Sequence, residues 1–140
     1  MATSKKKAAK NTAPEWHHFD ASEIVLGRLA TQAAHLLMGK HRPDFAPNTV
    51  APVHVVVTNA DKLKVTGQKL KQKTYYHYTG YAGNLKHRTL EEQMQRDSRK
   101  VIEAAVVGML PKNNLRKECM KHLKVYTGTE HPHSELATNA

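Results

Sequence analysis

The sequence predicts an α/β domain in which helices flank a single sheet. The run VHVVVTNA (53–60) is almost continuously apolar and β-branched, which is typical of a strand buried on both faces of a covered, parallel sheet. The segment LGRLATQAAHLLMGKH (26–41) instead repeats its leucines and alanines at helical spacing. Strands and helices therefore alternate along a chain of 140 residues, a length that fits one domain.

The chain begins with a basic tail. Residues 1–14 contain four lysines and no acid, so we expect a disordered basic N-terminal extension ahead of a single domain that spans 15–140. An aromatic strand is predicted at WHHFDA (16–21). Asp20 and Ser22 beside it are residue types suited to a turn or to the N-cap of the next helix.

The middle of the chain alternates between breaks and short strands. The helix at 26–41 should stop at Gly39, because glycine favours the backbone conformation that ends helices. Three prolines make 42–52 a loop. Beyond the buried strand, DKLKVTGQK (61–69) is predicted to be a short strand that ends at a glycine. KTYYHYTGY (73–81) is predicted to be a further strand that enters a glycine turn.

The C-terminal half is predicted to be mostly helical. TLEEQMQRD (89–97) opens with a capping-box pattern, in which Thr89 is the N-cap and Glu92 lies three residues further on. A second helix, SRKVIEAAVVGMLP (98–111), should end at its proline and bury one face; that face carries Val101, Ile102, Ala105, Val106 and Met109. The remaining predictions are a helix at 114–123, a strand at 124–128 and a tail at 129–140.

Composition points to a polyanionic partner. The formal net charge is +10 and the pI is near 9.8, which favours nucleic acid first and an anionic membrane surface second. The single cysteine, Cys119, excludes an internal disulfide framework and fits a reducing compartment. The sequence has no apolar run long enough to span a bilayer and no hydrophobic region of a secretory signal.

The positive charge is concentrated in particular segments. Between Lys62 and Arg88 there are seven Lys or Arg residues and no Asp or Glu. A solvated surface usually mixes both signs, so a stretch of one sign repels itself unless a partner neutralises it. Residues 112–124 repeat the bias, with five basic residues against Glu118. Together with the tail, these zones predict a surface wrapped by nucleic acid.

The tyrosine-rich segment is the main candidate site. GYAGN (80–84) matches no phosphate-binding glycine motif and is interpreted as a turn that needs positive φ at a glycine. Strand alternation puts Tyr76 and Tyr78 on one face and Tyr75 on the other. We expect at least two of the tyrosines to brace the sheet and Tyr81, in the turn, to contact a nucleotide.

Metal binding by the histidines and reactivity of the single cysteine are both less favoured. The ten histidines include His17-His18 and an HPH triplet at 131–133, but none has the spacing of a zinc motif. Polar or phosphate-facing histidines are the favoured interpretation. Cys119 lies among basic residues that would lower its pKa, yet a small buried apolar role is preferred.

Several motifs, read together, resemble the bacterial form of the large-subunit ribosomal protein family L-thirteen. The match runs from about Trp16 to His133. In order, the motifs are LGRLAT (26–31) with GKHRPDFAP (39–47), VVVTNADKLKVTGQK (55–69), KTYYHYTGY (73–81), AVVGMLPKNNL (105–115) and LKVYTGTEHPH (123–133). Each is modest alone, and their order and spacing make the resemblance specific.

The resemblance implies a structural protein of the cytoplasmic large ribosomal subunit. Its partners would be large-subunit rRNA, whose assembly it supports, and neighbouring ribosomal proteins. It implies no membrane, no small-molecule substrate, no cofactor, no metal and no catalysis. It also implies a three-layer α/β/α fold around a four-stranded, mainly parallel sheet with basic tails.

Combining the charged zones with this resemblance gives a set of predicted rRNA-binding side chains. They are Lys40, His41, Arg42, Lys69, Lys71, Lys73, Tyr81, Lys86, His87, Arg88, Lys112, Arg116, Lys117, Lys121, His131 and His133.

Two alternatives from other classes stay open at this point. A small RNA- or nucleotide-acting enzyme would use the Tyr/Gly loop 75–84 and would need an acid or base from elsewhere in the fold. A DNA-binding module is less favoured, because neither helix-turn-helix spacing nor a zinc finger is present in the sequence.

Overall fold

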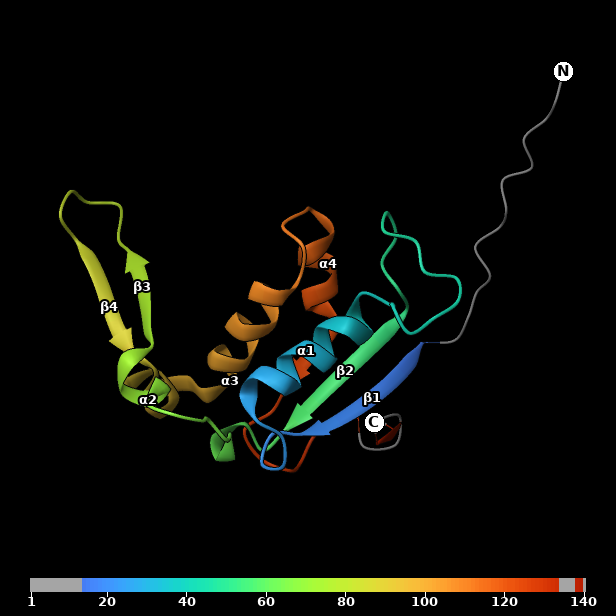
Figure 1. The fold of residues 1–140 in the computed structure, drawn as a ribbon, viewed down its shortest axis with the longest axis horizontal. Helices are drawn as coiled ribbons and strands as arrows, with labels where there is room; N and C mark the ends of the chain where they lie inside the picture. The colour runs from blue at the N-terminus through green and yellow to red at the C-terminus, as the bar shows by residue number, and fades with distance from the viewer. Residues whose placement is uncertain (1–13, 134–137, 140) are drawn as a thin grey trace, which may run out of the picture.

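A computed structural model describes residues 14–133 and 138–139 of the chain (Figure 1). Apart from Pro14, the predicted N-terminal extension lies outside the described residues. The mixed α/β class is confirmed. In chain order the elements are β1 (Glu15–Asp20), α1 (Leu26–Leu37), β2 (Val53–Thr58), the 3-10 turn η1 (Ala60–Lys62), α2 (Lys69–Gln72), β3 (Thr74–Tyr78), β4 (Leu85–Thr89), α3 (Leu90–Met109), α4 (Leu115–Lys121), β5 (Leu123–Val125) and β6 (Thr138–Asn139).

The main sheet is parallel and is built around β2. Its strand order is β5-β2-β1, and the two residues of β6 pair in parallel with the outer side of β1. Val53, Val55, Val56 and Val57 of β2 are all fully buried. Burial of consecutive residues covers both faces of the strand, as the apolar run predicted.

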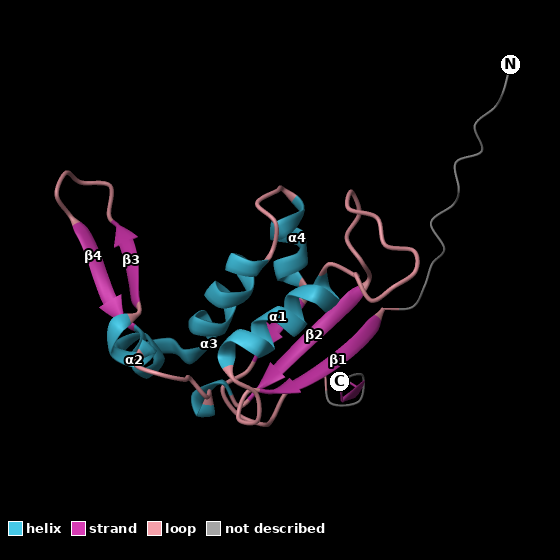
Figure 2. Cartoon of the chain, in the orientation of Figure 1, coloured by secondary structure: helices cyan, strands magenta, loops and turns pink. Residues whose placement is uncertain are grey.

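Helices α1, α3 and α4 lie on one face of this sheet (Figure 2). The core between them and the sheet combines side chains from both layers; these include Phe19, Leu29, Leu37, Val55, Val57, Val101, Ile102, Val106 and Cys119. The apolar stripes read from the sequence therefore face the sheet, and Cys119 is buried as preferred. Met109, which was also assigned to that stripe, is 42% exposed, whereas the next residue, Leu110, is buried.

The opposite face of the sheet carries aromatic rings and imidazoles. Trp16 stacks on His54, with 4.4 Å between ring centroids, and lies 4.8 Å from His133. His18 stacks on His131 at 5.6 Å. The segment up to His133 therefore folds back onto the sheet, which corrects the prediction of a tail from 129 onward. Aromatic stacking replaces solvent contact on that side of the strands.

The predicted strand at 61–69 is wrong. Asn59 follows β2 in the left-handed conformation (φ 57°), and its side-chain amide donates a hydrogen bond to the Asp20 carboxylate at 2.9 Å. The chain then makes the turn η1, touches α1's start through one isolated bridge from Lys64 to Val25, and turns again at Gly67 (φ 66°). The backbone has already left the sheet, so the alternating residues find no strand to pair with.

The segment predicted as a strand at 73–81 forms β3, but β3 does not join the main sheet. It pairs antiparallel with β4, which was not predicted, in a separate two-stranded sheet. Figure 1 shows this hairpin rising from α2 and standing away from α1, α4 and the main sheet. We call residues 74–89 the arm.

Helix α3 begins at the predicted capping box. The Thr89 hydroxyl accepts from the Glu92 backbone N–H at 3.3 Å, and the Glu92 carboxylate accepts from the Thr89 N–H at 3.0 Å. Asp97 interrupts the helix with an extended backbone, so the two predicted helices are joined across a kink. Within the described residues, no helix is long and apolar enough to cross a membrane.

Candidate nucleic-acid interface

The arm has one aromatic face. Its register sets Tyr76 opposite His87 and Tyr78 opposite Leu85, and side chains alternate along each strand, so these four share a face. The ring centroids of Tyr76 and His87 lie 6.5 Å apart. Tyr76 is 67% exposed, Tyr78 59% and Leu85 56%. Apolar side chains this exposed on one small surface indicate a binding site.

The other face of the arm is basic. Lys86 is opposite His77, and Arg88 is opposite Tyr75. Tyr75 packs partly against the core, and burial raises the pKa of its hydroxyl. The predicted group of Lys86, His87 and Arg88 is therefore divided: the two cations share the basic face, and His87 lies on the aromatic face.

The turn between the strands is the predicted glycine turn. Gly80 and Gly83 both have positive φ, 91° and 73°, which glycine adopts without steric cost. The carbonyl of Asn84 accepts from the backbone N–H of Thr79 at 3.4 Å and from its hydroxyl at 3.2 Å. Tyr81 is 75% exposed in this turn.

The four tyrosines of this segment differ in how they pack. Of the four, only Tyr75 packs against the core. Sequence reasoning missed Tyr76 and Tyr78 as contact candidates, although alternation had placed them on one face. Whether that face is buried depends on what packs against it, and none of the described residues forms a second layer there.

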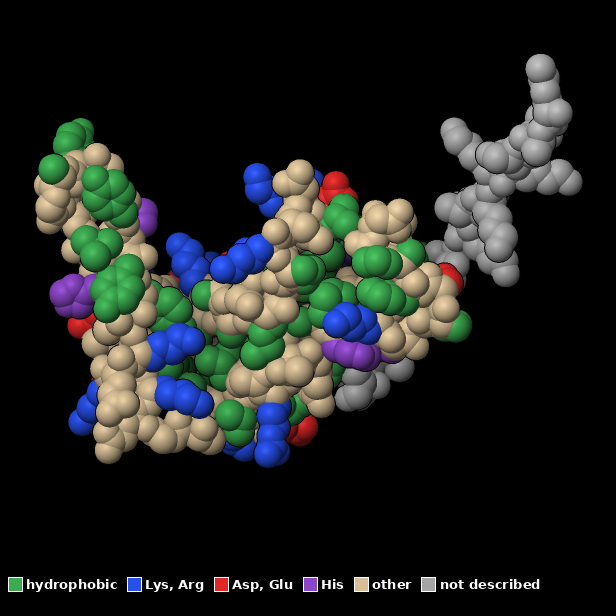
Figure 3. All heavy atoms as spheres, turned by 45° about the horizontal axis from the view of Figure 1, so that its top comes forward, with side chains coloured by type: hydrophobic (Ala, Val, Ile, Leu, Met, Phe, Trp, Pro, Cys, Tyr) green, Lys and Arg blue, Asp and Glu red, His purple; other side chains and the backbone are tan. Residues whose placement is uncertain are grey.

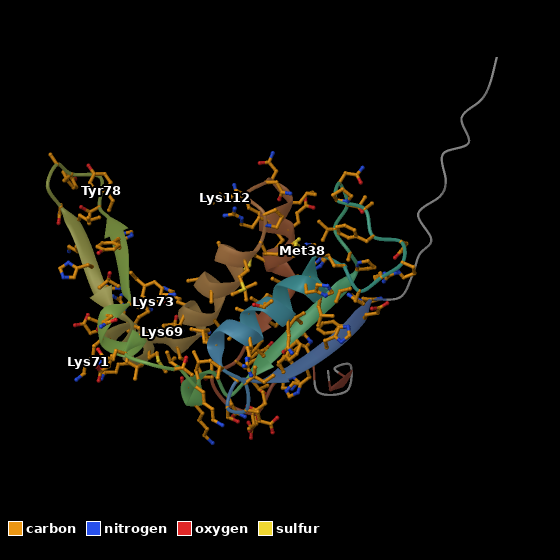
Figure 4. All side chains as sticks on the ribbon, viewed as in Figure 1. Met38, Lys69, Lys71, Lys73, Tyr78 and Lys112 are labelled. Carbon is orange, nitrogen blue, oxygen red and sulfur yellow. The ribbon has the colours of Figure 1, made fainter. Side chains whose placement is uncertain are left out.

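Three predicted lysines lie at the base of the arm. Lys69 and Lys71 belong to α2, Lys73 follows it, and the side-chain view places all three near the foot of β3 (Figure 4). The Lys73 ammonium is 5.5 Å from the centroid of the Tyr75 ring, within cation–π range. The Lys73 carbonyl accepts from the Leu90 N–H at 2.8 Å, which fixes this base to the start of α3.

The space-filling view shows an open notch between the arm and the rest of the protein, with Lys and Arg side chains gathered beside it (Figure 3). The loop after α3 and helix α4 carry the other predicted basic residues, Lys112, Arg116, Lys117 and Lys121. Figure 4 places Lys112 on the loop that rises from the same side as the arm. Arg116 and Lys40, far apart in sequence, line one mainly apolar cavity of about 480 Å³.

His41 and Arg42 are engaged within the protein. The Arg42 guanidinium contacts Glu15 at 3.0 Å and binds Asp44 through two hydrogen bonds of 3.0 and 3.2 Å. The hydrogen bond to Asp44 raises the pKa of Arg42. His41 Nε2 lies 3.1 Å from the other Glu15 oxygen. Both side chains therefore already bind carboxylates, and these carboxylates compete with an RNA phosphate for them.

His131 and His133 lie on the aromatic face of the main sheet. Besides His18 and Trp16, their ring neighbours include Tyr126, whose centroid is 5.7 Å from that of His131. Burial, followed by the nearby imidazoles of His18 and His133, lowers the pKa of His131, so its neutral form is favoured. The structure thus places this pair apart from the arm.

A mixed α/β body with an acid-free basic and aromatic arm defines a class: small basic proteins suited to a polyanion. The sequence profile of the family described as "Ribosomal protein L13" matches residues 14–132. The chain therefore belongs to the ribosomal protein L13 family, and the resemblance read from its motifs is confirmed.

Individual relatives are similar over almost the whole chain. The protein named "Large ribosomal subunit protein uL13" in Mycobacterium tuberculosis is 49% identical over 134 residues, which cover 96% of this chain and 90% of the relative. The proteins of the same name in Mycobacterium bovis and Mycobacterium leprae are 49% and 48% identical over the same lengths.

Proposed function

We propose that this protein is a structural, non-catalytic constituent of the cytoplasmic large ribosomal subunit. In that role it binds large-subunit rRNA, supports its assembly and contacts neighbouring ribosomal proteins. The names of its relatives support the proposal. The single observation that carries the RNA-binding part is the arm, which projects from the body inside a stretch with no Asp or Glu from Lys62 to Arg88.

The two faces of the arm suit two parts of an RNA. Lys86 and Arg88 on the basic face neutralise phosphates, and the planar guanidinium of Arg88 can make a two-pronged contact. On the aromatic face Tyr76 and Tyr78 offer exposed rings on which unpaired bases stack. Tyr81 extends that surface into the turn.

The remaining contacts come from the base of the arm and from the body. Figure 4 places Lys69, Lys71 and Lys73 at the foot of β3 and Lys112 on the loop after α3, and helix α4 carries further basic residues. We therefore assign the primary rRNA contacts to Lys40, Lys69, Lys71, Lys73, Tyr76, Tyr78, Tyr81, Lys86, Arg88, Lys112, Arg116, Lys117 and Lys121. A secondary group of proposed rRNA contacts consists of side chains that already have partners within the protein. These are His41, Arg42, His131 and His133.

The finer architecture and the domain boundaries belong to the same proposal. We propose a basic extension over 1–14 and one ribosomal-protein domain over 15–140. The proposed domain has a four-stranded sheet with a layer of structure on each face. The pairing of β6 with β1 supports the fourth strand, and the packing of residues 126–133 supports a covered second face.

The enzyme alternative finds no support at the Tyr/Gly loop. Among the described residues, the hydrogen bonds that Thr79 and Asn84 donate within the turn are accepted by backbone carbonyls, and no carboxylate takes part. General acid–base chemistry requires such a group within hydrogen-bond reach of the substrate. The relatives' printed name is that of a ribosomal protein and mentions no reaction.

The test is a double charge reversal in the arm, Lys86→Glu with Arg88→Glu. Both residues are exposed, so circular dichroism should report an unchanged fold. We expect the variant to be poorly incorporated into large subunits, because two phosphate contacts become repulsive. The matched control is Arg96→Glu with Lys100→Glu on exposed positions of α3, which changes the net charge equally.

Normal incorporation of the arm variant would remove the basic face from the binding surface. Equal loss in both variants would mean that total charge, and not the arm, determines binding. Loss in the arm variant with normal incorporation of the control supports the proposal.

A further inference from the structure

We propose that Glu15, His17 and His41 form a binding site for a divalent metal ion of the Zn²⁺ type. This inference is independent of rRNA binding. One carboxylate oxygen of Glu15 and one ring nitrogen from each of His17 and His41 lie within 4.8 Å of one another. Two imidazole nitrogens and a carboxylate oxygen are a common set of three protein ligands for Zn²⁺, with the fourth position left to water.

The geometry is close to what such an ion needs. Glu15 Oε2 lies 3.1 Å from His41 Nε2 and 4.0 Å from His17 Nε2. With metal–ligand bonds of about 2.0–2.1 Å in a tetrahedron, ligand atoms are about 3.4 Å apart. The three atoms therefore surround a point at bonding distance after small side-chain rotations.

The backbone positions each ligand. Glu15 and His17 are two residues apart on β1, so their side chains leave the strand on the same face. The turn after α1 brings in His41. Gly39 has φ 72° in that turn, and a Cβ built there would be 2.5 Å from the Ala51 Cβ, so only glycine fits.

His17 carries the second observation. Its Nε2 is buried and has no hydrogen-bond partner among the described residues. A buried polar atom without a partner is destabilising and often marks a site for an ion or a water.

The charge around the site accommodates a cation. Arg42 lies next to it but is held by Glu15 Oε1 at 3.0 Å and by both oxygens of Asp44. Two carboxylates and one guanidinium leave a net negative charge. Arg42 also orients the carboxylate so that Oε2 faces the two imidazoles, the role that outer partners play in metal sites.

The experiment uses the full-length protein after treatment with a chelator. Co²⁺, which reports tetrahedral coordination through visible absorption bands, is titrated in, and Zn²⁺ is then added to displace it. Melting temperature is measured with and without Zn²⁺, since an ion that binds only the folded state raises it. We expect Co²⁺ bands, their displacement by Zn²⁺ and a higher melting temperature.

Variants locate the site. His41→Ala, on an exposed loop, and His17→Phe, which keeps the ring volume, should each weaken Zn²⁺ binding by more than about tenfold. The controls are His87→Ala on the arm and His131→Phe on the other face of the main sheet, which should bind normally. The His41 variant decides the matter if His17→Phe fails to fold.

Absence of a Zn²⁺-dependent rise in the wild-type melting temperature would overturn the proposal. It would equally be overturned by His41→Ala with unchanged binding, or by loss of binding in His131→Phe alone.

Discussion

Strands β2 and β3 are alike in length and in their high β propensity, but they lie in opposite environments. Every valine of β2 is fully buried, whereas Tyr76 and Tyr78 of β3 are more than half exposed. The first strand pairs with β1 and β5 and is buried on both faces; among the described residues, the second pairs only with β4. Strand formation is thus a local property, while burial depends on the partners that the fold supplies.

The difference between the buried strand β2 and the exposed arm distinguishes the residues that stabilise the fold from those available for binding. A two-stranded hairpin is at best marginally stable alone in water, and the arm is fixed at its base by the Leu90–Lys73 hydrogen bond and by Tyr75 against the core. Beyond that base its faces are open to a partner. Substitutions in β2 should therefore change folding, and those along the arm should change binding.

The largest expected effect is that of Val57→Asp in β2. It places an unpaired carboxylate in a fully buried position, and we expect a loss of several kcal/mol from a total stability of about 5–15 kcal/mol. Urea unfolding and solubility measure this. The matched control, Leu85→Asp on the arm, should unfold almost normally. A Val57→Asp protein as stable as wild type would contradict the buried-strand assignment.

A smaller effect is expected from Tyr76→Ser with Tyr78→Ser. Both rings are exposed, so stability should hardly change, while rRNA affinity falls by about 1–3 kcal/mol for each base stack lost. Binding to large-subunit rRNA at fixed salt measures it. Unchanged affinity in this variant would show that bases do not stack on the aromatic face and would leave the basic face as the contact.

The smallest effect is expected at one lysine of the arm's base. Lys71→Ala should reduce the slope of log affinity against log salt by about one, the value for one phosphate contact. Lys100→Ala, a lysine of α3 outside the proposed interface, should leave the slope unchanged. A wild-type slope near zero would rule out electrostatic binding, and equal changes in both variants would remove the distinction between arm and body.

Local sequence determined those features whose physical cause lies within about a dozen residues. The apolar run of β2, the stripe of α1 and the capping box of α3 were each readable, because propensity, periodicity and capping are short-range interactions. The excess of positive charge could also be predicted, because it follows from the amino-acid composition alone. Family membership followed from motifs in a fixed order, which the profile match confirmed.

Only the tertiary structure decided which segments meet. The alternation at 61–69 predicts a strand, but Asn59 turns the chain away from the main sheet, and the described segment forms only the isolated bridge from Lys64 to Val25. The tyrosine pattern gave two faces, and the absence of a described layer over one of them made it a surface. His17 and His41 lacked a zinc-like spacing because their encounter depends on β1 and the turn after α1, which only long-range packing brings together.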